Sequence, residues 1–150
     1  MRSCVIIPAR FKSTRFPGKP LAKILKKEMI IWVAELSAIA VGKANVYIAT
    51  DDFKISDKVK EYGFNSIMTD SELITGTDRV AQAALSLDYD LFVNVQGDEP
   101  LIDPEGISKV VQSLVKEDDN VVASNAYTLI KEPYKVVDSD VVKVAFDKNE

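Results

Sequence analysis

Short apolar segments alternate with amphipathic ones along most of this chain, and this alternation constrains the fold most strongly. Segments rich in β-branched or aromatic residues favour strands at 3–9, 45–50, 64–69, 89–95 and 120–127. Helical periodicity occupies the intervals, at 29–41, 54–62, 78–87 and 105–116. Strands that are apolar throughout are typical of a sheet covered on both faces. The pattern therefore predicts a Rossmann-like, doubly wound, mainly parallel sheet flanked by helices.

The chain is long enough for a single α/β domain, and we expect residues 1–150 to form one nucleotide-binding domain. The segment 141–146 reads as one more strand, and residues 147–150 have a turn composition. A chain that stops in a turn directly after a strand looks interrupted. We therefore expect the domain to be truncated at its C-terminus.

The first predicted strand leads into a loop that carries only positive charge. Residues 1–27 hold 8 Lys or Arg and no acid, whereas the rest of the chain holds 11 against 23 Asp or Glu. Gly18 gives this loop freedom, and Arg10, Arg15 and Lys19 are suited to phosphate oxygens. The segment lacks the Walker A and dinucleotide-binding glycine patterns. Its charge alone fits a polyphosphate site and a solvated basic loop equally well.

A second polar segment, Asn94-Val95-Gln96-Gly97-Asp98-Glu99-Pro100, follows the fourth predicted strand. In a parallel sheet its polar end shares the carboxyl edge with the cationic loop, where open α/β sheets bind ligands. A carboxylate there suits Mg²⁺, which takes few protein ligands besides phosphate oxygens, so Asp98 is the predicted ligand. Gln96 is placed to hydrogen-bond a sugar or a base. The alternative interpretation is an ordinary turn.

The segment Thr75-Gly76-Thr77-Asp78-Arg79 allows two interpretations of nearly equal weight. Thr75 and Asp78 resemble a capping box, and Thr77 is a fair helix cap. Alternatively, the amides at this helix start contact a nucleotide while Arg79 braces a phosphate or a neighbouring carboxylate.

Two further features have structural interpretations. Asp51 and Asp52 follow the second predicted strand, and helix capping explains them at least as well as metal binding does. Trp32 on the first helix is expected to pack in the core.

Composition excludes several classes of function. A net charge of −4, with its positive part confined to one loop, argues against nucleic-acid binding. The chain has no His, so any chemistry uses carboxylates, cations, hydroxyls and backbone groups. The lone Cys4 lies within the first strand and is expected to be a buried, inert thiol. No signal peptide or membrane-spanning pattern is visible, so a cytoplasmic location is expected.

Four motifs together resemble the 3-deoxy-manno-octulosonate (Kdo) cytidylyltransferase, or CMP-Kdo synthetase, family. They are Ile-Pro-Ala-Arg-x-x-Ser-Thr-Arg-x-Pro-Gly-Lys-Pro at 7–20, Ala49-Thr50-Asp51, Gly76-Thr77-Asp78-Arg79 and Gln96-Gly97-Asp98-Glu99-Pro100. The resemblance implies Mg²⁺-dependent cytidylyl transfer from CTP to Kdo, with release of pyrophosphate, for lipopolysaccharide biosynthesis. It also implies that the protein forms a homodimer.

The same resemblance implies roles for individual residues. Nucleotide-binding positions are Ala9, Arg10, Ser13, Arg15, Lys19, Thr75, Gly76 and Arg79. Gln96 and Arg15 are the implied sugar contacts, and Asp98 is the implied Mg²⁺ ligand. Arg10, Lys19 and Asp98 form the implied catalytic set, because nucleotidyl transfer needs mainly positioning and charge neutralisation.

The chain departs from the family pattern at two points. Leu73 stands where many members carry His, which leaves an amino-substituted Kdo open as the sugar. The family also continues beyond the position of Glu150, and that part supplies sugar contacts, a second metal carboxylate and much of the dimer interface. The alternatives are a sialate-type cytidylyltransferase and a nucleotide-binding fragment without catalysis.

Overall fold

The computed structural model describes residues 1–12, 16–117 and 120–144. Its strands are β1 (Ser3–Ala9), β2 (Lys23–Ile24), β3 (Lys27–Glu28), β4 (Val46–Thr50), β5 (Asn65–Met68) and β6 (Leu91–Asn94). Its α-helices are α1 (Met29–Val41), α2 (Phe53–Glu61), α3 (Gly76–Ala84), α4 (Pro104–Lys116) and α5 (Pro133–Val137). Two short 3₁₀ turns, Lys19–Leu21 and Lys43–Asn45, complete the set.

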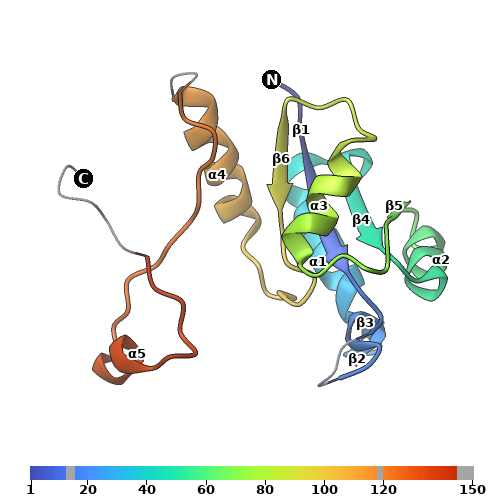
Figure 1. Cartoon of the computed structure of the whole chain (residues 1–150), viewed down its shortest axis with the longest axis horizontal. Helices are drawn as coiled ribbons and strands as arrows, with labels where there is room; N and C mark the ends of the chain where they lie inside the picture. The colour runs from blue at the N-terminus through green and yellow to red at the C-terminus, as the bar shows by residue number, and fades with distance from the viewer. Residues whose placement is uncertain (13–15, 118–119, 145–150) are drawn as a thin grey trace.

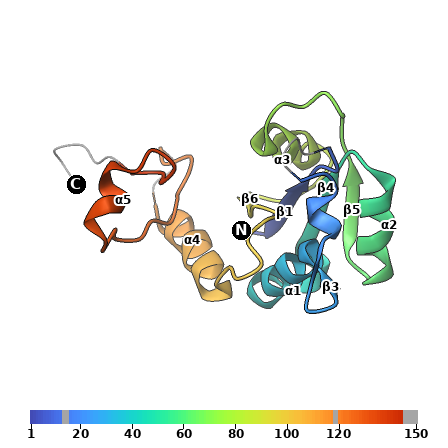
Figure 2. The same ribbon diagram turned by 90° about the horizontal axis from the view of Figure 1, so that it is seen from below.

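A four-stranded parallel sheet in the order β5-β4-β1-β6 forms the centre of the molecule. Helices flank it on both faces (Figures 1 and 2). Crossovers after β1, β4 and β5 return the chain to the same end of this sheet, as parallel pairing requires. The predicted Rossmann-like, doubly wound fold is confirmed.

Strand β1 divides the core into two halves. Val5, Ile7 and Ala9 join a cluster with residues of α1, α2 and α4. Cys4 and Ile6 point the other way and pack with α3. Successive side chains of a strand alternate between its faces, so a strand buried on both faces must be apolar throughout. Cys4 is fully buried and its pKa is raised to about 11 by burial, which confirms the buried thiol.

The sequence did not predict the hairpin of β2 and β3, which precedes α1. Its turn residues, Leu25 and Lys26, have positive φ values of 50° and 73°, a conformation that usually selects Gly or Asn. Trp32 lies against this hairpin instead of in either core cluster. Its Nε1 donates to the Ile24 carbonyl oxygen (2.9 Å), and the Lys27 Nζ lies 4.0 Å from the ring centroid.

Two predicted strands do not form in the described residues. The segment 120–127 has no regular structure, and neither has 141–144; residues 145 and 146 of the second prediction lie outside the described residues. The chain after α4 instead runs away from the sheet toward the short helix α5 (Figure 1). Both predictions rested on β-branched composition. A strand also needs a neighbouring strand to form hydrogen bonds with its backbone N–H and C=O groups. Within the described ranges neither segment has such a neighbour.

Candidate functional site

A pocket of about 320 Å³ lies at the carboxyl edge of the sheet. It combines the end of β1, the loop before α3 and the loop after β6. Its lining residues are Pro8, Ala9, Arg10, Lys19, Pro20, Met29, Leu73, Ile74, Thr75, Gly76, Arg79, Gln96, Gly97 and Asp98. Every predicted site residue within the described ranges belongs to this lining. Ser13 and Arg15 lie outside the described residues.

The cationic loop is closed at its base by the backbone. The Gly18 N–H donates to the Phe11 carbonyl oxygen (2.9 Å), and Gly18 has a φ of 71°. A side chain there would be strained and would also meet the Phe11 ring at 3.3 Å. This closure returns the chain so that Lys19 lies near the start of the loop, where Arg10 is exposed. The pocket therefore receives one cation from each end of the loop.

Lys19 contacts the predicted metal ligand directly. Its Nζ donates to Oδ2 of Asp98 at 2.6 Å, and the two side chains are 41% and 51% exposed. The contact joins the loop after β1 to the loop after β6. Both groups stay accessible, so a ligand entering the pocket meets a cation and a carboxylate side by side.

The loop after β6 passes very close to β1. A Cβ atom added to Gly97 would lie 2.7 Å from the Pro8 carbonyl oxygen, so only glycine fits at this position. The neighbouring Gln96 is exposed, and its Nε2 donates to Oδ1 of Asn94 (3.1 Å). Gln96 lines the pocket, and its carboxamide oxygen is a group that can accept from a ligand N–H or O–H.

Helix α3 begins at the pocket with a complete capping box. The Thr75 Oγ1 accepts from the Asp78 N–H (3.1 Å), and the Asp78 carboxylate accepts from the Thr75 N–H and hydroxyl. The hydroxyl hydrogen bond, followed by the backbone one, lowers the pKa of Asp78. Thr75 is thus the cap, and Thr77 lies within the first turn, contrary to the predicted role of Thr77 as a cap.

Arg79 has a buried side chain whose hydrogen bonds are made within the protein. Its guanidinium donates to the Thr69 hydroxyl, to the Asp70 carbonyl oxygen (3.2 Å) and to Oδ2 of Asp51 (3.4 Å). The Arg79 and Asp51 side chains are only 3% and 9% exposed. Of the two roles predicted for Arg79, the geometry corresponds to bracing a neighbouring carboxylate. Asp52 caps α2 by accepting from the Lys54 N–H (2.7 Å), as the sequence suggested.

Asp98 is the carboxylate that the pocket offers to a metal ion. No group of three or more Asp, Glu or Cys residues able to hold a metal occurs in the part of the chain that is described. A single accessible carboxylate next to two cations suits Mg²⁺, which keeps several waters and takes its remaining ligands from substrate phosphates. The residues present therefore fit a metal that arrives together with a nucleotide.

The sequence reasoning missed the apolar walls of the pocket and the partner of Arg79. Pro8, Pro20 and Met29 line the pocket, as does Ile74, which is 83% exposed. The apolar pair Leu73-Ile74 directly before the polar segment Thr75–Arg79 is the sequence signal that could have indicated this wall. The Asp51–Arg79 pair joins residues 28 positions apart, so no local motif reveals it.

A larger cavity, of about 620 Å³, lies between β6 and α4. Its lining contains no Lys or Arg, which makes it unsuited to a polyphosphate. None of the described helices has the length and apolar character needed to span a bilayer.

Solved structures that resemble this fold include nucleotidyltransferases. A nucleotidyl transfer enzyme from Methanothermobacter thermautotrophicus has a TM-score of 0.65 at 11% identity, which concerns the fold alone. The structure of CMP:2-keto-3-deoxy-manno-octonic acid synthetase complexed with CTP has a TM-score of 0.75 at 37% identity. That match covers 78% of this chain and 48% of the other. The fold is thus that of an α/β nucleotidyltransferase.

Sequence comparison defines the family. The family profile described as cytidylyltransferase matches residues 4–150, and the chain belongs to this family. The 3-deoxy-manno-octulosonate cytidylyltransferase of Solibacter usitatus is 44% identical over 95% of this chain and 56% of its own length. The 8-amino-3,8-dideoxy-manno-octulosonate cytidylyltransferase of Shewanella woodyi is 41% identical over 99% of this chain and 62% of its own length. The chain thus spans little more than half the length of these relatives.

Proposed function

We propose that this chain carries the nucleotide site of a Kdo cytidylyltransferase, which transfers a cytidylyl group from CTP to Kdo for lipopolysaccharide biosynthesis. The observation that carries the proposal is the single pocket in which Arg10 and Lys19 accompany Asp98 at the carboxyl edge of the sheet. The 44% identity to the Solibacter usitatus enzyme supports the choice of nucleotide and sugar.

In the proposed reaction the oxygen of the sugar's anomeric hydroxyl bonds to the α-phosphorus of CTP, and the hydroxyl proton is released to solvent. The bond from that phosphorus to the bridging oxygen breaks, and pyrophosphate leaves with the electron pair. Negative charge grows on the departing oxygens, so fixed cations nearby lower the barrier. Arg10 and Lys19 supply those cations, and Ser13 and Arg15 of the same loop are proposed to join them. Such a reaction requires positioning and charge neutralisation and no histidine base.

The remaining pocket residues are assigned by chemistry and position. Ala9, Thr75 and Gly76, which line the pocket, are the proposed nucleotide contacts. Arg79, whose guanidinium donates to the Asp70 carbonyl oxygen, is proposed to hold the loop before α3 in place. Gln96 and Arg15 are proposed sugar contacts. Asp98 would hold Mg²⁺, which when bound shields the charge of the phosphates.

An 8-amino sugar is the second candidate acceptor. Three relatives from Shewanella with 40–41% identity are named for the 8-amino-3,8-dideoxy sugar. Leu73, which stands where many family members carry His, lines the pocket. A competition assay with both sugars separates the candidates. A homodimer and a cytoplasmic location remain predictions.

The first test concerns the nucleotide. With Mg²⁺, CTP is expected to raise the melting temperature more than UTP or ATP does, because only the state that binds is stabilised. Arg10→Ala and Asp98→Asn should each reduce that shift, while Lys60→Ala, at an exposed site on α2, should not. Equal shifts with CTP and ATP would refute the cytidylyl assignment.

Pyrophosphate release then tests catalysis. Release that depends on CTP and on Kdo or its 8-amino analogue is expected if the chain holds enough of the sugar site. CTP-specific stabilisation without release would support a nucleotide-binding fragment instead.

A further inference from the structure

We infer that the hairpin of β2 and β3 docks the protein on the surface of an anionic phospholipid bilayer, without spanning it. Leu25 enters the headgroup region, and the lysines around it contact lipid phosphates. This docking is independent of the proposed reaction, because none of residues 23–28 lines the nucleotide pocket. The hairpin projects beyond the end of the central sheet, where a flat surface can reach it (Figure 1).

The turn of the hairpin is strained, and its apolar side chain gains little packing in return. Leu25 and Lys26 have φ values of 50° and 73°, and they are the only non-glycine residues with positive φ in the described ranges. Positive φ at both central positions of a hairpin turn normally selects Asn-Gly. Leu25 is nevertheless 86% exposed, so contacts within the described protein do not offset the strain. An exposed apolar side chain on a strained turn indicates a contact outside the folded chain.

Contacts with α1 fix the hairpin in place. The Trp32 Nε1 donates to the Ile24 carbonyl oxygen (2.9 Å). The Lys27 Nζ donates to Oε2 of Glu35 (2.5 Å) and lies 4.0 Å from the centroid of the Trp32 ring. A tip whose backbone is held before docking loses little conformational entropy when it docks. Trp32 is also the only tryptophan of the chain, so its fluorescence reports on this hairpin.

Lysines surround the apolar tip. Lys23 and Lys26 are exposed on either side of Ile24 and Leu25. Among the described residues, Glu28 is the one carboxylate within ion-pair distance of either lysine, and its Oε1 lies 4.0 Å from the Lys23 Nζ. Glu28 is itself buried. The surface of the hairpin is therefore cationic around an apolar tip.

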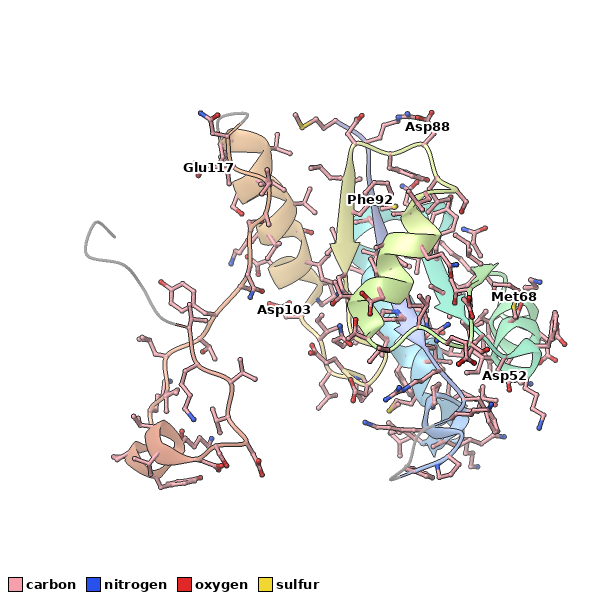
Figure 3. All side chains as sticks on the ribbon, in the orientation of Figure 1. Asp52, Met68, Asp88, Phe92, Asp103 and Glu117 are labelled. Atoms are coloured by element: carbon pink, nitrogen blue, oxygen red, sulfur yellow. The ribbon has the colours of Figure 1, made fainter. Side chains whose placement is uncertain are left out.

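The rest of the chain has the opposite charge. Residues 1–27 hold 8 Lys or Arg and no acid, whereas residues 28–150 hold 11 against 23 Asp or Glu. Figure 3 shows Asp88 at the end of the molecule opposite the hairpin. An anionic surface attracts the end that carries the hairpin and repels the remainder. Charge thus turns the hairpin toward an anionic surface.

A bilayer fits this tip better than a folded partner does. A stable protein interface buries about 800 Å² on each side. The apolar part of the hairpin tip consists of Ile24 and Leu25, which are 38% and 86% exposed. A bilayer surface requires no shape complementarity, accepts an apolar side chain at the headgroup boundary and gains roughly five-fold in affinity for each lysine nearby. Contacts of this number give weak, reversible docking.

Trp32 fluorescence during titration with vesicles tests the inference. The chain is mixed with vesicles of phosphatidylcholine and phosphatidylglycerol, and separately with vesicles of phosphatidylcholine alone. We expect an emission change with the anionic vesicles that weakens as salt is added, and quenching of Trp32 by brominated acyl chains. An equal response to both kinds of vesicle, or no binding to the anionic vesicles at low salt, would overturn the inference.

A replacement of the turn separates docking from folding. Leu25→Asn combined with Lys26→Gly installs the residues that positive φ favours, so the melting temperature should rise. The same change removes the apolar tip and one cation, so vesicle affinity should fall by on the order of 50-fold. Leu85→Asn is the control, because it replaces a leucine that is 89% exposed three residues before Asp88, and it should leave vesicle affinity unchanged. If the double variant binds vesicles as well as the unmodified chain does, the hairpin is not the docking site.

Two other partners are distinguished by further measurements on the same proteins. Binding of polyglutamate without binding of anionic vesicles would assign the hairpin to an acidic protein and refute the lipid assignment. Sedimentation measures self-association. Association that rises with protein concentration and is lost in the double variant would assign the hairpin to a second copy of the chain, which also contradicts the lipid assignment.

Discussion

The Nζ atom of Lys19 lies 2.6 Å from Oδ2 of Asp98, which connects two loops that are 79 residues apart in the sequence. Both side chains are about half exposed, so the pair contributes little to stability, on the order of 1 kcal/mol or less. Its importance lies in position. It places a cation and a carboxylate side by side in the lining of the same pocket, where a nucleotide with its metal would engage both.

Lys19→Met is expected to weaken binding of CTP with Mg²⁺ by roughly 10- to 100-fold, because a hydrogen bond to a charged group is lost. The free energy of unfolding should change by less than about 1 kcal/mol, because the pair is exposed. Titration calorimetry and urea unfolding measure the two effects. Lys60→Met, on the exposed surface of α2, is the control. Unchanged CTP affinity would remove Lys19 from the site.

Arg79→Met is expected to lower the free energy of unfolding by on the order of 3 kcal/mol. The substitution leaves the carboxylate of Asp51 buried without its partner. Urea denaturation measures the loss. Lys109→Ala breaks the exposed pair with Glu105 (2.9 Å) and should cost no more than about 0.5 kcal/mol. Equal effects of the two substitutions would contradict the structural role of the buried pair.

Two glycine substitutions are expected to have opposite effects. Gly97→Ala places a methyl group 2.7 Å from the Pro8 backbone oxygen and should destabilise the protein by roughly 1–3 kcal/mol. Gly106→Ala lies within α4, and the nearest atom to the new methyl group is 3.8 Å away, on Asp103. That change should stabilise by about 0.5–1 kcal/mol through helix propensity. Melting temperatures of both variants test the expectation, and a stable Gly97→Ala would contradict the close approach.

The Asp78 cap is expected to give the protein a pH-dependent stability. Hydrogen bonds lower the pKa of Asp78 from 3.8, so the stabilisation is complete above that value and disappears as the pH falls through the lowered pKa. Urea unfolding of the wild type and of Asp78→Asn should therefore converge below pH 3.8. Thr75→Val removes the hydroxyl that makes the strongest of these hydrogen bonds, so it should reduce the difference. If the difference in the free energy of unfolding between wild type and Asp78→Asn does not change with pH, the Asp78 cap is excluded as its source.

Local patterns predicted most of the regular structure. The boundaries of α1 and β1 were predicted to the residue, because apolar periodicity and flanking breakers coincide there. The failures have one cause in common. The segment 120–127 has the composition of a strand but no neighbour in the described residues, and the hairpin of β2 and β3 has a turn made by Leu25 and Lys26. Neither pairing nor a positive φ at a non-glycine residue is recorded in local composition.

The site was predicted only in part, because local motifs do not record contacts between distant residues. Residues on the two polar loops were expected to meet because parallel strands bring their carboxyl ends to one edge. The pocket does bring together Arg10, Lys19, Gln96 and Asp98. The capping box was readable because its partners are three residues apart. The burial of Arg79 against Asp51 could not be predicted, because a local motif does not determine the direction in which a long side chain points.

The sequence by itself determined the sheet with its flanking helices, the position of the cationic loop at the carboxyl edge and the membership of the cytidylyltransferase family. These follow from periodicity and motifs, which are properties of neighbouring residues. Only the tertiary structure decided that Lys19 contacts Asp98, that Arg79 faces Asp51 and that β6 pairs with β1 alone among the described strands. Those relationships depend on how distant segments pack, and packing is set by the whole core at once.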